Sequence, residues 1–184
     1  WLGLSFSAYA DKEVSLVFAG DTVLDDTAGK IIEQGGDPFS DFADFFAGAD
    51  IRITNLECVV ATRGQANEKM YTFQAHPRVI AVLKKHFDAV TLANNHSGDF
   101  GPDAFAEMLS LLKEAGLAQV GGGMNLKQAH TPLVFTRNGL RIAVLSYNEF
   151  HPRSFEAGFD IPGVAWSEDQ QVTQDIQTAR RVHR

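Results

Sequence analysis

Ala89-Val90-Thr91-Leu92-Ala93-Asn94-Asn95-His96 is an apolar run that ends abruptly in two carboxamides and an imidazole. A short apolar run bounded in this way is typical of a buried strand. In open α/β sheets, ligands bind beyond the carboxyl ends of the strands. Carboxamide oxygens and imidazole nitrogens there suit a metal ion and an anionic ligand. The segment therefore predicts an α/β fold with a polar site at one edge of the sheet.

Two other predicted strands end in polar residues in the same way, Leu16-Val17-Phe18-Ala19-Gly20-Asp21 and Ile51-Arg52-Ile53-Thr54-Asn55-Leu56-Glu57. Taken alone, Asp21 is typical of a turn or a helix N-cap, and Asn95-His96 also fits a turn cap. Glu57 precedes the apolar residues 58–60, so we expect its carboxylate to be partly buried and to need a partner or a cation. Three such strand ends together favour a functional site.

Predicted strands alternate with predicted helices, which indicates a parallel α/β core. One helix is expected to begin at Pro102 and to end at Gly116. Asn138-Gly139 lies between two apolar runs and predicts a β-hairpin. The long loops 58–75 and 148–166 are expected to carry function. The predicted strands are residues 14–19, 51–54, 89–93 and 117–120, with the hairpin at 133–147.

The net charge of −7 and the pI of about 5.3 argue against nucleic acid as the main partner, because phosphate backbones attract basic surfaces. The single cysteine, Cys58, excludes an intrachain disulfide and a cysteine zinc knuckle. We expect Cys58 to be a small core residue.

Residues 1–10 end in Ala8-Tyr9-Ala10, the A-x-A pattern of a signal-peptide cleavage site. We expect a signal-peptide remnant here, and hence an exported protein of the periplasm, the cell envelope or the extracellular space. The alternative is a disordered or packed N-terminal arm. A missing N-terminus leaves membrane anchoring open. Residues 11–184 are expected to form the N-terminal part of one domain whose last helix begins at the capping box 167–170 and continues into further chain.

Further side chains are candidates for the same site. Asp99 either orients the imidazole of His96 or belongs to a turn at residues 97–101. His151 lies in a long loop and is expected to reach the substrate. The triple glycine 121–123 predicts a tight turn near the site. The predicted substrate-binding residues are Asn55, Asn94 and His151, and the predicted catalytic residues are His96 and Asp99.

The chain resembles the CapA-type capsule-synthesis proteins, also called poly-γ-glutamate synthesis proteins, of the calcineurin-like metallophosphoesterase superfamily. Asn-Asn-His-x-x-Asp-x-Gly at residues 94–101 is the most specific part of the resemblance. The resembling segments, in order, are residues 18–21, 55–57, 92–101 and 120–126.

This resemblance implies a sandwich of two sheets between helices, an α/β/β/α arrangement, incomplete here, with one or two metal ions at one edge. Asp21, Glu57 and Asn95 would be ligands to Mn, Fe or Zn. His96 would contact the phosphoryl group or protonate the leaving oxygen.

Two departures accompany the resemblance. The wider superfamily usually has Asp-x-His at the first motif, whereas Val23 stands here and cannot coordinate a metal. The later histidine motifs of the family do not occur in this sequence. We therefore expect this chain by itself to bind metal weakly and to show no turnover.

The resemblance implies a role in biosynthesis or export of a bacterial capsule or poly-γ-glutamate, with a metallophosphoesterase-type site. One alternative is an active phosphoesterase that acts on a phosphoester of the envelope. Another is a non-catalytic component that binds an anionic polymer. In each case the partners would be that polymer or phosphoester and other envelope polymer-synthesis proteins.

Overall fold

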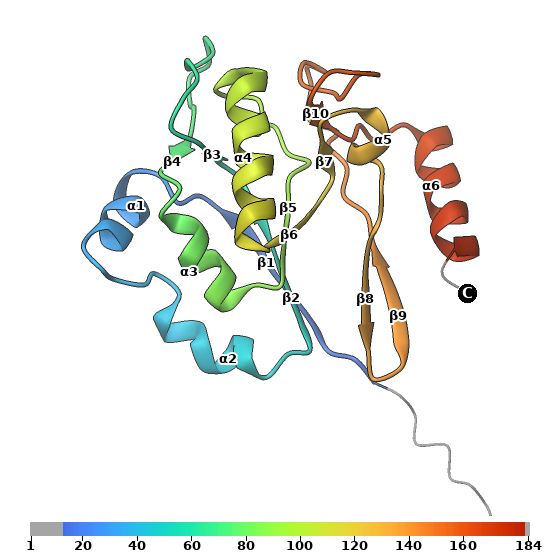
Figure 1. Ribbon diagram of the computed structural model, residues 1–184, viewed down its shortest axis with the longest axis horizontal. Coiled ribbons are helices and arrows are strands. Elements are labelled where there is room, and N and C mark those ends of the chain that lie inside the picture. The colour runs from blue at the N-terminus through green and yellow to red at the C-terminus, as the bar shows by residue number, and fades with distance from the viewer. Residues whose placement is uncertain (1–12, 183–184) are drawn as a thin grey trace, which may run out of the picture.

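The computed structural model describes residues 13–182; the predicted signal-peptide remnant lies outside them. Its centre is a sheet of four parallel strands in the order β1-β2-β5-β6 (Figure 1). Because parallel strands all end at the same edge, the polar residues at the ends of β1 and β2 and those after β5 are brought together there. The strands are β1 (Leu16–Thr22), β2 (Ile51–Leu56), β5 (Ala89–Thr91) and β6 (Ala118–Val120).

Helices cover one face of this sheet (Figure 1). The longest, α4, has proline in its first turn and ends at Gly116, whose φ of 68° is the left-handed conformation that favours glycine, as predicted. Its apolar face buries Phe105, Met108 and Leu112 completely. The elements on this face are α1 (Asp26–Glu33), the 3-10 turn η1 (Ser40–Phe42), α2 (Ala43–Ala47), α3 (Val79–His86) and α4 (Gly101–Ala115).

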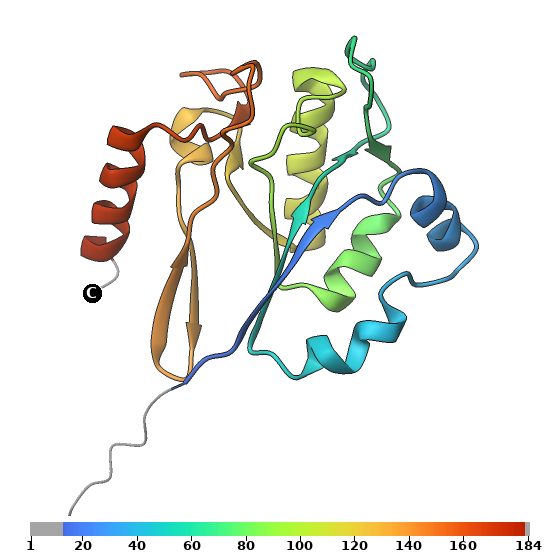
Figure 2. The same cartoon turned by 180° about the vertical axis from the view of Figure 1, so that it is seen from behind.

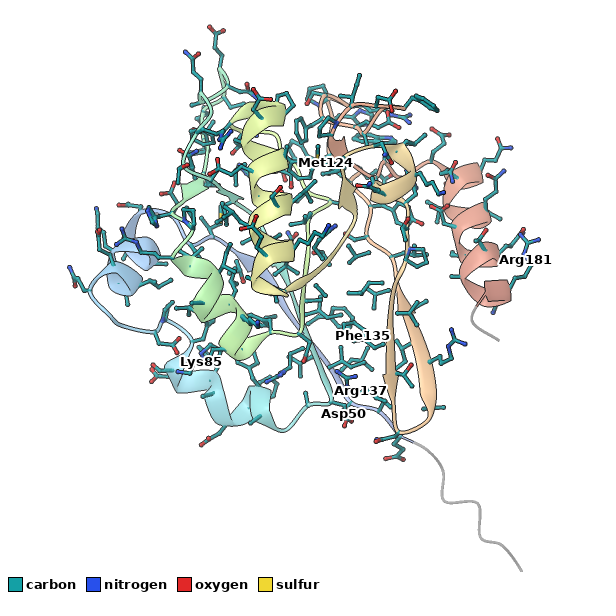
Figure 3. All side chains as sticks on the ribbon, viewed as in Figure 1. Asp50, Lys85, Met124, Phe135, Arg137 and Arg181 are labelled. Carbon is teal, nitrogen blue, oxygen red and sulfur yellow. The ribbon has the colours of Figure 1, made fainter. Side chains whose placement is uncertain are left out.

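A two-stranded hairpin packs on the other face, and α6 (Asp169–Val182) lies outside it (Figures 1 and 2). The hairpin joins β8 (Leu133–Arg137) to β9 (Leu140–Val144) through Asn138 and Gly139, with φ of 50° and 74°, as predicted. Phe135 packs on the core sheet, and Arg137 Nε donates to the backbone oxygen of Asp50 at 3.2 Å (Figure 3). The layer order helices, sheet, hairpin, helix confirms the α/β class.

Short elements complete the fold, and the sequence did not predict them. They belong to the long loops and to the glycine-rich turn. They are β3 (Val59–Val60), β4 (Gln74–Ala75), β7 (Gly122–Gly123), β10 (Gly163–Val164) and α5 (Leu126–Ala129).

Several predicted strand ends differ from the structure by two or three residues, and two predicted elements differ more. The first strand is found at residues 16–22 instead of 14–19, with an irregular register between Phe18 and Asp21. Asp37-Pro38, followed by Phe39, Phe42 and Phe46 at helical spacing, predicts a single helix that ends at Gly48, whereas the structure has a 3-10 turn followed by a five-residue helix. A 3-10 turn has three residues per turn instead of about 3.6, so the phenylalanines no longer lie on one face. Phe42 is 57% exposed, while Phe46 is buried.

The Asp37 carboxylate joins this helical segment to α3. It accepts hydrogen bonds from Lys85 Nζ at 2.7 Å, from His86 Nε2 at 2.8 Å and from the backbone N–H of Phe39 at 3.0 Å. Burial alone would raise the pKa of Asp37, but these hydrogen bonds outweigh it and lower the pKa to about 2. A carboxyl group whose pKa is lowered by folding stabilises the fold at pH values above its ordinary pKa of 3.8. This stabilisation is lost as the pH falls towards 2.

We expect Asp37→Asn to lower the free energy of unfolding by about 1 kcal/mol at pH 7, because Lys85 is exposed and solvent screens its contact. Asparagine still accepts from the Phe39 N–H. The difference in the free energy of unfolding between the unchanged protein and Asp37→Asn should become smaller as the pH falls from about 4 to about 2. Urea denaturation across this range measures it, with the exposed Asp41→Asn as control. A difference in the free energy of unfolding that does not change with pH would show that the stabilisation does not depend on the charge of Asp37.

Candidate functional site

Asn55 connects the ends of three strands. Its Nδ2 donates to Asp21 Oδ1 at 2.8 Å, and its Oδ1 accepts from the Thr91 hydroxyl at 3.1 Å and from Asn94 Nδ2 at 3.0 Å. The carboxamide therefore fixes Asp21 relative to the Asn-Asn-His segment. These hydrogen bonds already occupy both the Nδ2 and the Oδ1 of Asn55. The contact of Asn55 with substrate stays a prediction.

Asn94 holds the segment after β5 in place. Its Nδ2 also donates to the backbone oxygen of Leu56 at 2.9 Å, and its Oδ1 accepts from the His96 N–H at 2.9 Å and the Ser97 hydroxyl at 3.2 Å. The residue is only 6% exposed. In this structure Asn94 builds the turn that presents His96, and its substrate-binding role stays a prediction.

His96 and Asp99 form a hydrogen-bonded pair. The imidazole Nδ1 donates to Asp99 Oδ2 at 2.7 Å, which leaves Nε2 as the free ring nitrogen, 3.9 Å from Glu57 Oε1. The Phe73 ring packs on the imidazole at a centroid distance of 4.5 Å. Both predicted alternatives for Asp99 are present, because its N–H also closes a turn onto the His96 carbonyl at 3.1 Å. A histidine oriented in this way can accept or donate a proton at Nε2.

Residues 61–73, called here the 61–73 loop, hold Asp99 from the opposite side. Lys69 Nζ donates to Asp99 Oδ1 at 2.5 Å and to the Asn95 carbonyl at 2.8 Å, and the Phe73 N–H donates to Asp99 Oδ2 at 2.9 Å. The Asp99 side chain is completely buried. Sequence reasoning missed Lys69, since a lysine in a long loop carries no pattern that distinguishes it from a solvated one.

The carboxylates of Asp21 and Glu57 are neighbours at the sheet edge. Burial raises the pKa of Glu57, and the negative charge of Asp21 raises it further. The Asn95 carboxamide and His96 Nε2, the other predicted groups at this edge, have no hydrogen-bond partner among residues 13–182. Two carboxylates, an amide and an imidazole are the donor types that a divalent metal such as Mn, Fe or Zn prefers.

The acidic and histidine side chains at this edge are not gathered into a metal-binding group in the part of the chain that the structure describes. Within residues 13–182, no group of three or more histidine, cysteine, aspartate or glutamate side chains is arranged to hold a metal ion. Val23, which cannot coordinate a metal, is half-buried directly after β1. The types of donor at this edge therefore fit a divalent metal, and their arrangement in residues 13–182 does not by itself form a metal site.

The other histidines have separate environments. His151 is exposed, and its ring contacts Trp166 at a centroid distance of 5.4 Å, so the reach to substrate stays a prediction. His86 and His130 are buried and pair with aspartates. Cys58 is buried, and burial raises the pKa of its thiol to about 12, which agrees with the predicted core role.

The fold and these strand ends define an α/β protein of metallophosphoesterase-like architecture. Residues 15–183 match the family model described as bacterial capsule synthesis protein PGA_cap, and the chain belongs to this family.

Three curated relatives are similar to the chain. It is 27% identical to the PGA biosynthesis protein CapA of Bacillus subtilis (strain 168) over 180 residues, which are 94% of this chain and 47% of the relative. It is 25% identical to the capsule biosynthesis protein CapA of Bacillus anthracis over 146 residues, 76% of this chain and 36% of that protein. A probable polyglutamine synthesis accessory protein of Mycobacterium tuberculosis (strain H37Rv) is 31% identical over 123 residues, which are 62% of this chain and 32% of that protein. The chain thus spans about half or less of these relatives.

Proposed function

We propose that this chain takes part in the biosynthesis or export of a bacterial capsule polymer such as poly-γ-glutamate, as an accessory component. The match of residues 15–183 to the capsule-synthesis family carries the proposal. The names of two relatives, PGA biosynthesis protein and capsule biosynthesis protein, point to the same process.

In this proposal, the polar edge of the sheet is a metallophosphoesterase-type site that receives an anionic polymer or a phosphoester. Asp21, Glu57 and Asn95 would hold a divalent metal, together with groups beyond this chain's own set. When bound, the metal would activate water and neutralise oxygen charge. A cation there also explains how a chain of net charge −7 attracts an anionic ligand.

Capsule polymers lie at the cell surface, so we propose an exported protein that works with envelope polymer-synthesis proteins. Among the described residues 13–182, no helix is long and apolar enough to cross a membrane.

Complementation tests the proposed function. Residues 15–183 replace the matching segment of the Bacillus subtilis relative, and the chimera is expressed in a strain that lacks that relative. We expect the chimera to restore most of the polymer, and Glu57→Gln to restore much less, because Glu57 is a proposed metal ligand. Glu33→Gln, on the exposed side of α1, is the matched control. Surface polymer is measured per cell, and restoration that is equal in all variants would contradict a role for the site.

One observation favours a second candidate function, a metal-dependent phosphoesterase. The hydrogen bond of 2.7 Å between His96 Nδ1 and Asp99 fixes the ring so that Nε2 faces the carboxylate edge. A polymer-binding protein has no need for an oriented proton donor, whereas a hydrolase uses one to protonate its leaving group.

A further inference from the structure

A cavity of about 220 Å³ lies beside the His96–Asp99 pair. It shares Asn94, Asn95 and Asp99 with the candidate site, and its walls come from two loops. These are the 61–73 loop and residues 148–162, called here the 148–162 loop, which lie on either side of the N-terminal end of α4 (Figures 1 and 2). A group bound here would therefore adjoin His96.

The cavity carries no net charge. Its two charged residues are Lys69 and Asp99, and they neutralise each other in an ion pair of 2.5 Å. A site for phosphate or carboxylate needs an excess of donors or positive charge. The lining therefore suits an uncharged part of a ligand.

Each loop presents unused hydrogen-bonding capacity. Asn67 donates through Nδ2 to the Gly98 carbonyl at 2.7 Å, and its Oδ1 has no partner within residues 13–182. Asn148 accepts the Phe150 N–H through Oδ1 at 3.1 Å, and its Nδ2 has no partner in the same range. The Ser154 hydroxyl is also unpaired there. One loop thus offers an acceptor and the other a donor.

The rest of the 148–162 loop supplies an apolar wall of Phe150, Pro152 and Phe155. The Phe155 ring contacts Phe105 of the core at a centroid distance of 5.2 Å. It also fills the space above Gly98, where an added Cβ would lie 2.4 Å from the ring. Phe155 is therefore held in place, and the wall can pack against methylene groups.

We propose that this cavity binds one secondary amide, with its adjoining methylene groups, of a polyamide chain. In a trans amide the N–H and the C=O point to opposite sides. The N–H would donate to Asn67 Oδ1 on one loop, and the C=O would accept from Asn148 Nδ2 on the other. The inference rests on the proposed function, because a γ-linked glutamate chain contains such amides and methylenes.

The same groups fit a sugar less well. A sugar ring brings several hydroxyl donors, and the unused side-chain acceptors among the residues that line the cavity are few: Asn67 Oδ1, Asn95 Oδ1 and the Ser154 hydroxyl. Hydroxyl groups buried without partners would cost binding free energy.

Binding measurements with two synthetic probes test the proposal. One is a tetramer of γ-linked glutamate, and the other is its uncharged analogue, in which every carboxylate is converted to a carboxamide and the terminal amine is acetylated. Asn148→Ser removes the Nδ2 donor and keeps a side-chain acceptor for the Phe150 N–H. We expect it to weaken both probes roughly fivefold to tenfold by calorimetry, as for one lost hydrogen bond. Gln177→Ser, which removes an exposed amide on α6, should have no effect.

The outcomes separate this inference from the proposed function. If Asn148→Ser leaves both affinities unchanged, or if neither probe binds, the subsite is overturned, while the complementation assay still decides the function. Binding of maltotetraose that depends on Asn148 would overturn the amide assignment in favour of a sugar. If only the uncharged analogue binds and depends on Asn148, the subsite is supported and poly-γ-glutamate as the polymer is contradicted.

Discussion

Asp99→Ala is expected to lower the free energy of unfolding by about 2 to 4 kcal/mol, because the buried carboxylate accepts hydrogen bonds from three donors while its ionic partner Lys69 is partly exposed. The carboxylate is completely buried and accepts from Lys69, His96 and the Phe73 N–H. Alanine leaves the His96 Nδ1–H and the Phe73 N–H without their acceptor, and Lys69 keeps only the Asn95 carbonyl. The free energy of unfolding is measured by urea denaturation at pH 7.

Two comparisons make this prediction specific. Asp99→Asn keeps the shape and one acceptor, and should cost about 1 to 2 kcal/mol. Asp103→Ala, on the exposed first turn of α4, should cost less than about 0.5 kcal/mol. Hydrogen exchange at the Phe73 amide should also become faster in Asp99→Ala. Loss of less than about 1 kcal/mol with unchanged exchange would show that Asp99 does not hold the loop.

The fold was predictable where the signals are local. Asn138-Gly139 determines the hairpin because both residues adopt positive φ, and Pro102 and Gly116 delimit α4 for similar reasons. The edge at which the polar residues meet follows from the parallel order of the strands. Such features depend on a few neighbouring residues and on the direction of the chain.

The contacts that complete the site were not predictable in this way. Lys69 and Asp99 are 30 residues apart, and Asp37 and His86 are 49 apart. The first pair depends on the path of the 61–73 loop, and the second depends on how the segment before α2 packs on α3. No local sequence pattern specifies either arrangement. Asn55 shows the same limit, because the sequence indicates a polar strand end but not that its carboxamide is occupied by Asp21 and Asn94.

His96→Ala should lower any phosphoesterase rate by about 10² to 10⁴, the usual contribution of a general acid or base. The reason is geometric: Asp99 fixes Nδ1, so Nε2 is the position from which a proton reaches a leaving oxygen. The assay uses the chimera with the Bacillus subtilis relative, supplied with Mn²⁺ or Zn²⁺, and measures hydrolysis of a phosphomonoester and a phosphodiester. His76→Ala, on the exposed cap of α3, is the control.

The same measurement decides between chemistry and binding at this site. His96→Gln retains a polar side chain of similar length without a titratable proton, so a catalytic role predicts nearly the same loss as for alanine. A chimera that binds metal and the γ-linked glutamate tetramer but hydrolyses neither phosphoester would exclude phosphoester hydrolysis. In that case the His96–Asp99 pair would act by holding the Asn-Asn-His segment against the polymer. Its loss would then lower affinity without affecting any rate.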